Sequence, residues 1–203
     1  MKQTPILHKL VRENLVSDPE GARGRLLREA ARLFRDKGYE RTTVRDLAAA
    51  VGIQSGSLFH HFRTKEDILK AVMVETIRLN TALMKAAVEA ADAPREKLRA
   101  LVRAELESIN GQTGEAMAVL VFEWRSLSPD SQSEVLKLRD IYEALWLEVL
   151  GTLREQGDIQ ADPFVVRRIL TGALSWTVTW YKPERGGLTL DGLTDQVMAM
   201  MNL

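Results

Sequence analysis

The stretch that decides the fold runs from residue 42 to residue 62 and reads TTVRDLAAAVGIQSGSLFHHF. Its apolar residues recur at helical spacing on either side of a glycine. They are Val44, Leu47, Ala48, Val51, Leu58 and Phe62. Thr42 or Thr43 can cap the first helix, and Gly52 ends it. The pattern predicts two short helices, residues 43–50 and 55–61, that pack against each other across a glycine turn.

Several side chains of this stretch would point away from the helix pair. They are Gln54, Ser55, Ser57, Phe59 and His60. They are short or polar enough to enter the major groove of DNA without a steric block. The spacing alone leaves a second interpretation open, in which the pair is a surface hairpin inside a larger helical bundle.

Working outward, apolar spacing is helical along most of the chain, and no segment alternates in the way a strand does. The sequence therefore predicts an all-α fold with nine helices. Their expected spans are 23–37, 43–50, 55–61, 65–90, 94–110, 114–127, 129–156, 163–182 and 190–202. Residues 1–22 are expected to form a flexible or weakly helical arm, residues 23–68 a helix-turn-helix domain, and residues 69–203 a ligand-binding and dimerisation domain.

The net charge of zero hides an asymmetry along the chain. Residues 1–70 hold 14 Lys and Arg against 9 Asp and Glu, a net charge of +5, whereas residues 71–203 hold 14 against 19, a net charge of −5. A basic N-terminal part on an acidic body is typical of a protein whose one end meets phosphate.

Composition also excludes some chemistry. The chain has no cysteine, which excludes disulfides, zinc–thiolate sites and thiol nucleophiles. No apolar run is long enough to span a bilayer, and the start of the sequence lacks the apolar core of a signal peptide. A cytoplasmic protein without a membrane partner is therefore expected.

The three histidines do not predict a metal site or an active site. His60 and His61 are adjacent and point about 100° apart on a helix, and His8 is the only other histidine. A nucleophile activated by histidine would need one outside the DNA-facing segment, and only His8 qualifies. We expect no metal, no catalytic residue and no enzyme activity, although a lysine- or carboxylate-based enzyme is not excluded by sequence.

The run from Leu26 to Leu69 resembles the DNA-binding signature of the TetR family of bacterial repressors. The matching residues are Ala30-Ala31-Arg32-Leu33-Phe34, Gly38-Tyr39, Thr42-Thr43-Val44, Gly52-Ile53, the segment from Gly56 to Phe62, and Lys65-Glu66. The resemblance implies that Thr43 caps its helix and touches phosphate, that Gln54, Ser55 and Gly56 approach bases, and that His61 and Lys65 bind the DNA backbone. The full set of expected DNA-contacting residues is Thr42, Thr43, Arg45, Gln54, Ser55, Gly56, Ser57, Phe59, His60, His61 and Lys65. Phe59 stands where the family usually has tyrosine, which removes a hydroxyl but keeps an apolar contact available.

The segment around Trp176 and Trp180 resembles a TetR subgroup that includes repressors of steroid and fatty-acid breakdown, whose inducers are CoA thioesters. Gly172 stands where that subgroup can have an arginine, while Arg167 and Arg168 lie further up the helix. The two tryptophans share a helix face and can line a pocket or simply pack in the core. The expected ligand-binding residues are Met73, Met84, Met117, Phe122, Trp146, Arg167, Arg168, Trp176, Trp180 and Tyr181.

The last two helices are expected to form a homodimer with their symmetry mates. Their interface residues are expected to be Leu170, Leu174, Val178, Leu193, Val197 and Met200. The hypothesis is a repressor that binds a palindromic operator as a dimer and is released by an acyl-CoA or related thioester, with no cofactor. Two alternatives stay open: a repressor that senses another hydrophobic small molecule, and a ligand-independent architectural DNA-binding protein.

Overall fold

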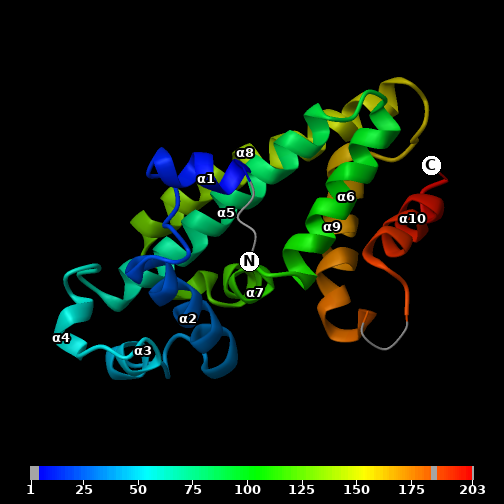
Figure 1. Cartoon of the computed structure of the whole chain (residues 1–203). Helices are drawn as coiled ribbons and strands as arrows, with labels where there is room; N and C mark the ends of the chain where they lie inside the picture. Colours follow the sequence, from blue (N-terminus) through cyan, green and yellow to red (C-terminus); the bar gives the residue numbers. More distant parts are fainter. Residues whose placement is uncertain (1–4, 184–186, 203) are drawn as a thin grey trace. The chain divides into compact units, whose positions relative to one another are not determined.

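The computed structural model describes residues 5–183 and 187–202, and over these ranges the chain forms ten α-helices, one short 3-10 helix and no strand (Figure 1). The elements are α1 Pro5–Arg12, α2 Ala22–Lys37, α3 Val44–Ala50, α4 Ser55–Leu58, α5 Lys65–Glu89, α6 Pro94–Asn110, α7 Gly114–Phe122, η1 Trp124–Ser126, α8 Pro129–Glu155, α9 Pro163–Trp180 and α10 Leu190–Met200. The all-α prediction is confirmed. Helix α4 is shorter than the predicted 55–61, and the predicted helix 114–127 is divided into α7 and η1.

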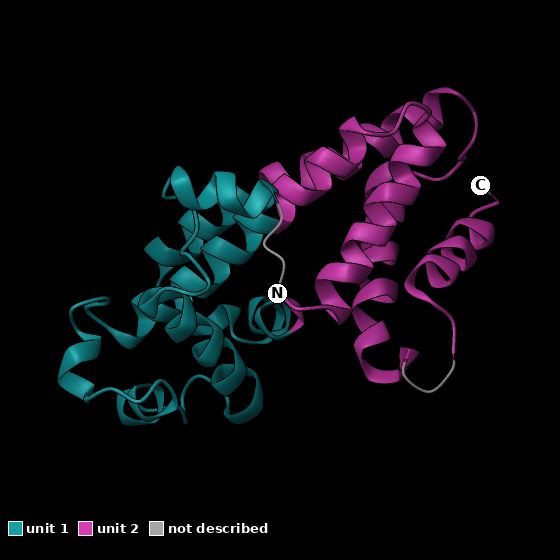
Figure 2. Ribbon diagram, in the orientation of Figure 1, with its two compact units in different colours: residues 1–79, 115–139 teal, residues 80–114, 140–203 magenta. Residues whose placement is uncertain are grey.

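The chain divides into two compact units, shown in teal and magenta in Figure 2. Unit 1 comprises residues 1–79 and 115–139, and unit 2 comprises residues 80–114 and 140–203. The boundary between the units falls inside the long helices α5 and α8. The predicted helix-turn-helix domain, residues 23–68, is therefore only a part of unit 1. No described helix is long and apolar enough to cross a membrane.

Helix α1, which is not among the nine predicted spans, lies within the predicted arm and makes the tenth helix. Leu7 and Leu10 of α1 are buried, as is Val16 after it. The guanidinium of Arg78 on α5 donates to the carbonyl of Leu15 at 2.9 Å, and Glu75 accepts from the backbone N–H and hydroxyl of Ser17. Residues 15–17, which follow α1, are therefore fastened to α5 by long-range hydrogen bonds. Residues 1–4 of the predicted arm lie outside the described residues.

Each unit has its own core. In unit 1 the ring of Phe34 on α2 is completely buried and meets the ring of Tyr39 edge-on, with 5.4 Å between ring centroids. In unit 2, helix α6 packs against both α9 and α10. Two ion pairs, Arg99–Asp195 and Arg103–Asp191, both at 2.8 Å, join α6 to α10.

Candidate nucleic-acid interface

The helix-turn-helix of unit 1 is built on a small apolar core. Leu47 and Ala48 of α3 and Leu58 of α4 are buried, as is Phe62. Gly52 between the helices has a φ of +71°, a left-handed conformation that favours glycine, and the N–H of the next residue donates to the carbonyl of Ala48 at 3.0 Å. The predicted packing of two short helices across a glycine turn is therefore confirmed.

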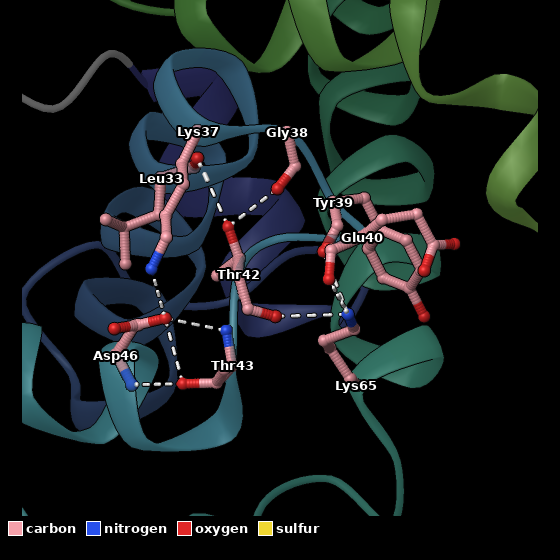
Figure 3. Close-up of polar contacts among 9 residues, drawn as sticks. All are labelled: Leu33, Lys37, Gly38, Tyr39, Glu40, Thr42, Thr43, Asp46 and Lys65. Atoms are coloured by element: carbon pink, nitrogen blue, oxygen red, sulfur yellow. Dashed lines mark hydrogen bonds and ion pairs between the residues drawn. The ribbon is translucent and has the colours of Figure 1, made fainter.

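A reciprocal set of hydrogen bonds fixes the start of α3 (Figure 3). The backbone N–H of Asp46 donates to the hydroxyl of Thr43 at 3.1 Å, and the backbone N–H of Thr43 donates to the Asp46 carboxylate at 2.8 Å. Lys37 at the end of α2 donates to the same carboxylate at 2.6 Å. These bonds, chiefly the one from Lys37 and then those from Thr43, lower the pKa of Asp46 to about 2. The carboxylate therefore stays charged, and the cap intact, throughout the neutral range.

Lys65, at the start of α5, closes the turn between α2 and α3 (Figure 3). Its ammonium donates to the carbonyl of Tyr39 at 2.8 Å and to that of Thr42 at 3.0 Å, and it lies 4.0 Å from the centroid of the Tyr39 ring. The hydroxyl of Thr42 donates to the carbonyl of Gly38 at 2.8 Å. Lys65 thus ties the residues before α3 to helix α5. We name this group, Tyr39, Thr42 and Lys65, the turn lock.

Most of the expected DNA-contacting side chains lie on the exposed surface of this unit. Exposed residues are Thr43, Arg45, Gln54, Gly56, Ser57, Phe59, His60 and His61, and Ser55 is half-buried. A Cβ added at Gly56 would meet nothing within 4 Å, so nothing within the described chain requires a glycine there. The expected DNA contact of Thr42 does not fit its position, because its side chain is completely buried in the turn lock.

Sequence reasoning missed the residues that support the interface from behind. Glu123 accepts a hydrogen bond from the backbone N–H of Tyr39 at 3.2 Å, and Glu66 accepts one from the backbone N–H of Ser128 at 2.9 Å. The hydrogen bonds from Ser128 and Ser131 lower the pKa of Glu66. The partners are separated by more than 60 residues, so no local sequence signal identifies them.

The turn lock yields a prediction about the free protein. Replacing Lys65 with Met should lower the free energy of unfolding by about 2 kcal/mol, because the hydrogen bonds of a charged donor to two carbonyls are lost. Urea denaturation without DNA measures this. Lys70→Met is the control: Lys70 pairs with Glu134 at 3.2 Å at the surface, and the loss of this pair should cost at most about 1 kcal/mol. Equal stability of Lys65→Met and the parent protein would show that Lys65 does not lock the turn.

The expected ligand-binding residues divide between the two units. Met73, Met117 and Phe122 belong to unit 1, and the other seven belong to unit 2. Within unit 2 the structure brings together Trp146 and Arg167, with 4.2 Å between the guanidinium carbon and the ring centroid. Trp176 and Trp180 share a face of α9, as predicted, but that face is open, with the two side chains 67% and 52% exposed.

The expected dimerisation residues also divide into two groups. Leu170, Leu174 and Leu193 are buried inside unit 2, Val197 is half-buried, and Val178 and Met200 are exposed. A different set of residues forms an unpartnered apolar surface. It follows the spacing i, i+4, i+11, i+15 along α9 and consists of Val165, Ile169, Trp176 and Trp180, all about half or more exposed. Gly172 and Ala173, both exposed, complete this surface, which we call the α9 stripe.

Comparison with known proteins agrees with this geometry. The model of bacterial regulatory proteins of the tetR family matches residues 26–72, and the model of the tetracyclin repressor-like C-terminal domain matches residues 91–202. The repressor KstR2 of Mycolicibacterium smegmatis is 31% identical over 188 residues, which are 91% of each chain.

Two solved structures extend the comparison. A structure described as the superantigen pfit is 56% identical with a TM-score of 0.84 and covers 96% of both chains. AibR in complex with isovaleryl coenzyme A and operator DNA is 27% identical with a TM-score of 0.79, covering 88% of this chain and 96% of that one.

An all-helical chain with an exposed, capped helix-turn-helix in a basic N-terminal part is a DNA-binding transcriptional regulator. The two family models and the KstR2 relative then identify its family: the chain belongs to the TetR family of transcriptional repressors.

Proposed function

We propose that this protein binds a palindromic operator as a homodimer and leaves it when an acyl-CoA or a related thioester binds to its body. The DNA-binding part of this proposal rests on one observation, the exposed polar side chains on the outward face of the helix-turn-helix. Gln54, at the start of α4, makes no side-chain hydrogen bond to cap its helix, so its amide is available to a base edge. Arg45 on α3 is exposed and suits a phosphate contact.

The proposal of a homodimer rests on the α9 stripe. Ile169 and Trp176 are each about two-thirds exposed, and apolar surfaces of this kind commonly mark protein–protein interfaces. Two copies related by a twofold axis would bury their stripes against each other. They would then present two helix-turn-helix units to half-sites about 34 Å apart, or a multiple of that distance. Under this proposal Trp176 and Trp180 belong to the dimer interface.

The proposal of a thioester effector rests on relatives. AibR has been crystallised with isovaleryl coenzyme A and operator DNA, and it resembles this chain over most of its length. Arg167 and Arg168, both expected to bind the ligand, are not free to bind its phosphates, because both pair with Glu143, at 3.1 Å and 2.5 Å. The acyl part of the effector is therefore the part that we expect unit 2 to recognise.

The experiment that tests the DNA-binding proposal is selection from random double-stranded DNA, followed by substitution. Gln54→Ala should weaken binding to the selected operator by about 1–3 kcal/mol and relax base preference at one position of each half-site. Arg45→Ala should weaken binding to all sequences. It should also reduce the slope of log affinity against log salt concentration by about one for each half-site. Selection of a motif without dyad symmetry would contradict the proposal.

The effector proposal is tested separately on the protein–operator complex. CoA thioesters, the matching free acids and CoA alone are titrated in, and release of DNA is followed by fluorescence anisotropy. The thioesters should release DNA, and CoA alone should not. Release by free acids or unrelated lipophiles only would favour a different hydrophobic effector. Release by none of these compounds would favour a ligand-independent protein.

A further inference from the structure

A buried polar cluster lies inside unit 2, where α6, α8 and α9 contribute Glu105, Tyr142, Glu143, Trp146 and Arg167. Nη2 of Arg167 lies 3.7 Å from a carboxylate oxygen of Glu105, and Nε lies 3.1 Å from one of Glu143. The Tyr142 hydroxyl donates to Glu105. Trp146 and Arg167 are 0% and 2% exposed. We call this group the Arg167 cluster.

Two donors of this cluster have no acceptor within the described part of the chain. They are Nη1 of Arg167 and Nε1 of Trp146, and a third such buried atom, Oγ1 of Thr81, lies on α5 of the same unit. Buried donors without a partner are rare in proteins, because they have lost water and gained nothing in exchange. The guanidinium of Arg167 lies over the Trp146 ring, 4.2 Å from the ring centroid, so the side chains that carry the two donors are in contact.

The charges of the surroundings limit what can accept from them. Glu105 and Glu143 both form ion pairs with Arg167, and Glu143 also pairs with Arg168 at 2.5 Å. Two arginines therefore face two carboxylates. A third carboxylate would have to enter beside Glu105 and Glu143 among largely buried side chains, which is unfavourable. A neutral carbonyl oxygen meets no such repulsion, and its two lone pairs can accept from both donors.

We propose that Trp146 and Arg167 form the polar end of the effector site and bind the carbonyl oxygen of an acyl thioester through the indole N–H and the free guanidinium N–H. This rests on the proposed function, since it assigns the atoms that recognise the proposed effector. Glu105 and Glu143 hold the guanidinium in place and disfavour a free acid. The apolar acyl chain of the effector extends away from the cluster.

Matched pairs of probes test the carbonyl contact. Isovaleryl-CoA, hexanoyl-CoA and dodecanoyl-CoA are each compared with the S-alkyl-CoA thioether of the same chain, in which a methylene replaces the carbonyl. The intact protein should bind a thioester about tenfold more tightly than its thioether, because only the thioester accepts from the two donors. Trp146→Phe should reduce this preference at least threefold and leave thioether affinity unchanged. Trp124→Phe, on η1 in unit 1, is the control and should keep the preference.

A second measurement needs no variant that could misfold. The chain has four tryptophans, so its indole N–H resonances are few, and that of Trp146 should shift downfield with a thioester but not with its thioether. If the Trp146 indole N–H resonance shifts with neither probe, then water, not an effector, satisfies this donor. Binding of both probes with equal affinity would overturn this inference and leave the effector class standing. If no thioester binds, the effector class and the inference both fail, while DNA binding is unaffected.

Discussion

Replacing Ile169 with Asp is expected to turn the proposed homodimer into a monomer of 22.8 kDa and to weaken operator binding by about two orders of magnitude or more. Ile169 lies in the middle of the α9 stripe and is 66% exposed in the isolated chain. At the centre of a self-complementary interface the new carboxylate would be desolvated without a cation to pair with, and it would face its own symmetry mate. The second half-site contact then ceases to be intramolecular, which accounts for the loss of affinity.

Light scattering at micromolar concentration measures the mass, and a gel shift on the selected operator measures the affinity. Ile141→Asp is a matched control, because Ile141 is the same residue type, is 58% exposed and lies on α8. It should leave the dimer intact. A dimeric Ile169→Asp variant with full affinity would show that the interface lies on another surface, and the assignment of Trp176 and Trp180 to it would fail as well.

The parts of the structure that were predictable from sequence are those that depend on local spacing. The helix-turn-helix is one example, since the positions of Leu47 and Leu58 relative to Gly52 already determine which faces meet. The cap at Thr43 is another, because its partner Asp46 is three residues away. Sequence also predicted that Trp176 and Trp180 share a helix face, because they lie four residues apart.

What could not be predicted depends on partners far away in the sequence. The arm was predicted only as flexible or weakly helical, because the contacts of residues 15–17 with Glu75 and Arg78 on α5 span about 60 residues of sequence. The contact of Lys65 with the DNA backbone was taken from the family resemblance, which says nothing of its partners within the chain. The carbonyls of Tyr39 and Thr42 that it binds lie 26 and 23 residues earlier. Periodicity also cannot tell whether an apolar face is covered, which is why the expected interface included the buried Leu170 and omitted Ile169.

The same reasoning applies to Arg167, which was expected to bind the ligand. Its sequence neighbours show two adjacent arginines, but not Glu105 and Glu143, which lie 62 and 24 residues earlier in the chain. In the fold the charge of Arg167 is already balanced, and Glu105 is itself fully buried. Burial, as the dominant cause, raises the pKa of the Glu105 carboxyl from its ordinary value of 4.5, and the charge of Arg167 opposes that rise.

Replacing Arg167 with Met is therefore expected to lower the free energy of unfolding by about 3 kcal/mol at pH 7, because a buried carboxylate loses its cation. This cost has an upper limit, because Glu105 can take up a proton instead of remaining charged. Protonation costs about 1.4 kcal/mol for each unit by which the working pH exceeds the ordinary pKa of the carboxyl. Because folding raises the pKa of the Glu105 carboxyl, its protonated form contributes stability below pH 4.5. This contribution is lost as the pH rises through the pKa of the folded state. The destabilisation by Arg167→Met should consequently shrink between pH 7 and pH 5.

Urea denaturation of the parent and variant proteins at pH 5, 6, 7 and 8 measures this trend. Arg168→Met is the control, because Arg168 is exposed and its pair with Glu143 should contribute at most about 1 kcal/mol at any of these pH values. Adding Glu105→Gln to Arg167→Met removes the titrating group and should abolish the pH dependence, recovering most of the lost stability at pH 8. A destabilisation of the same size at every pH, unaffected by Glu105→Gln, would mean that Arg167 acts through its packing on Trp146, and the electrostatic account of the cluster would have to be given up.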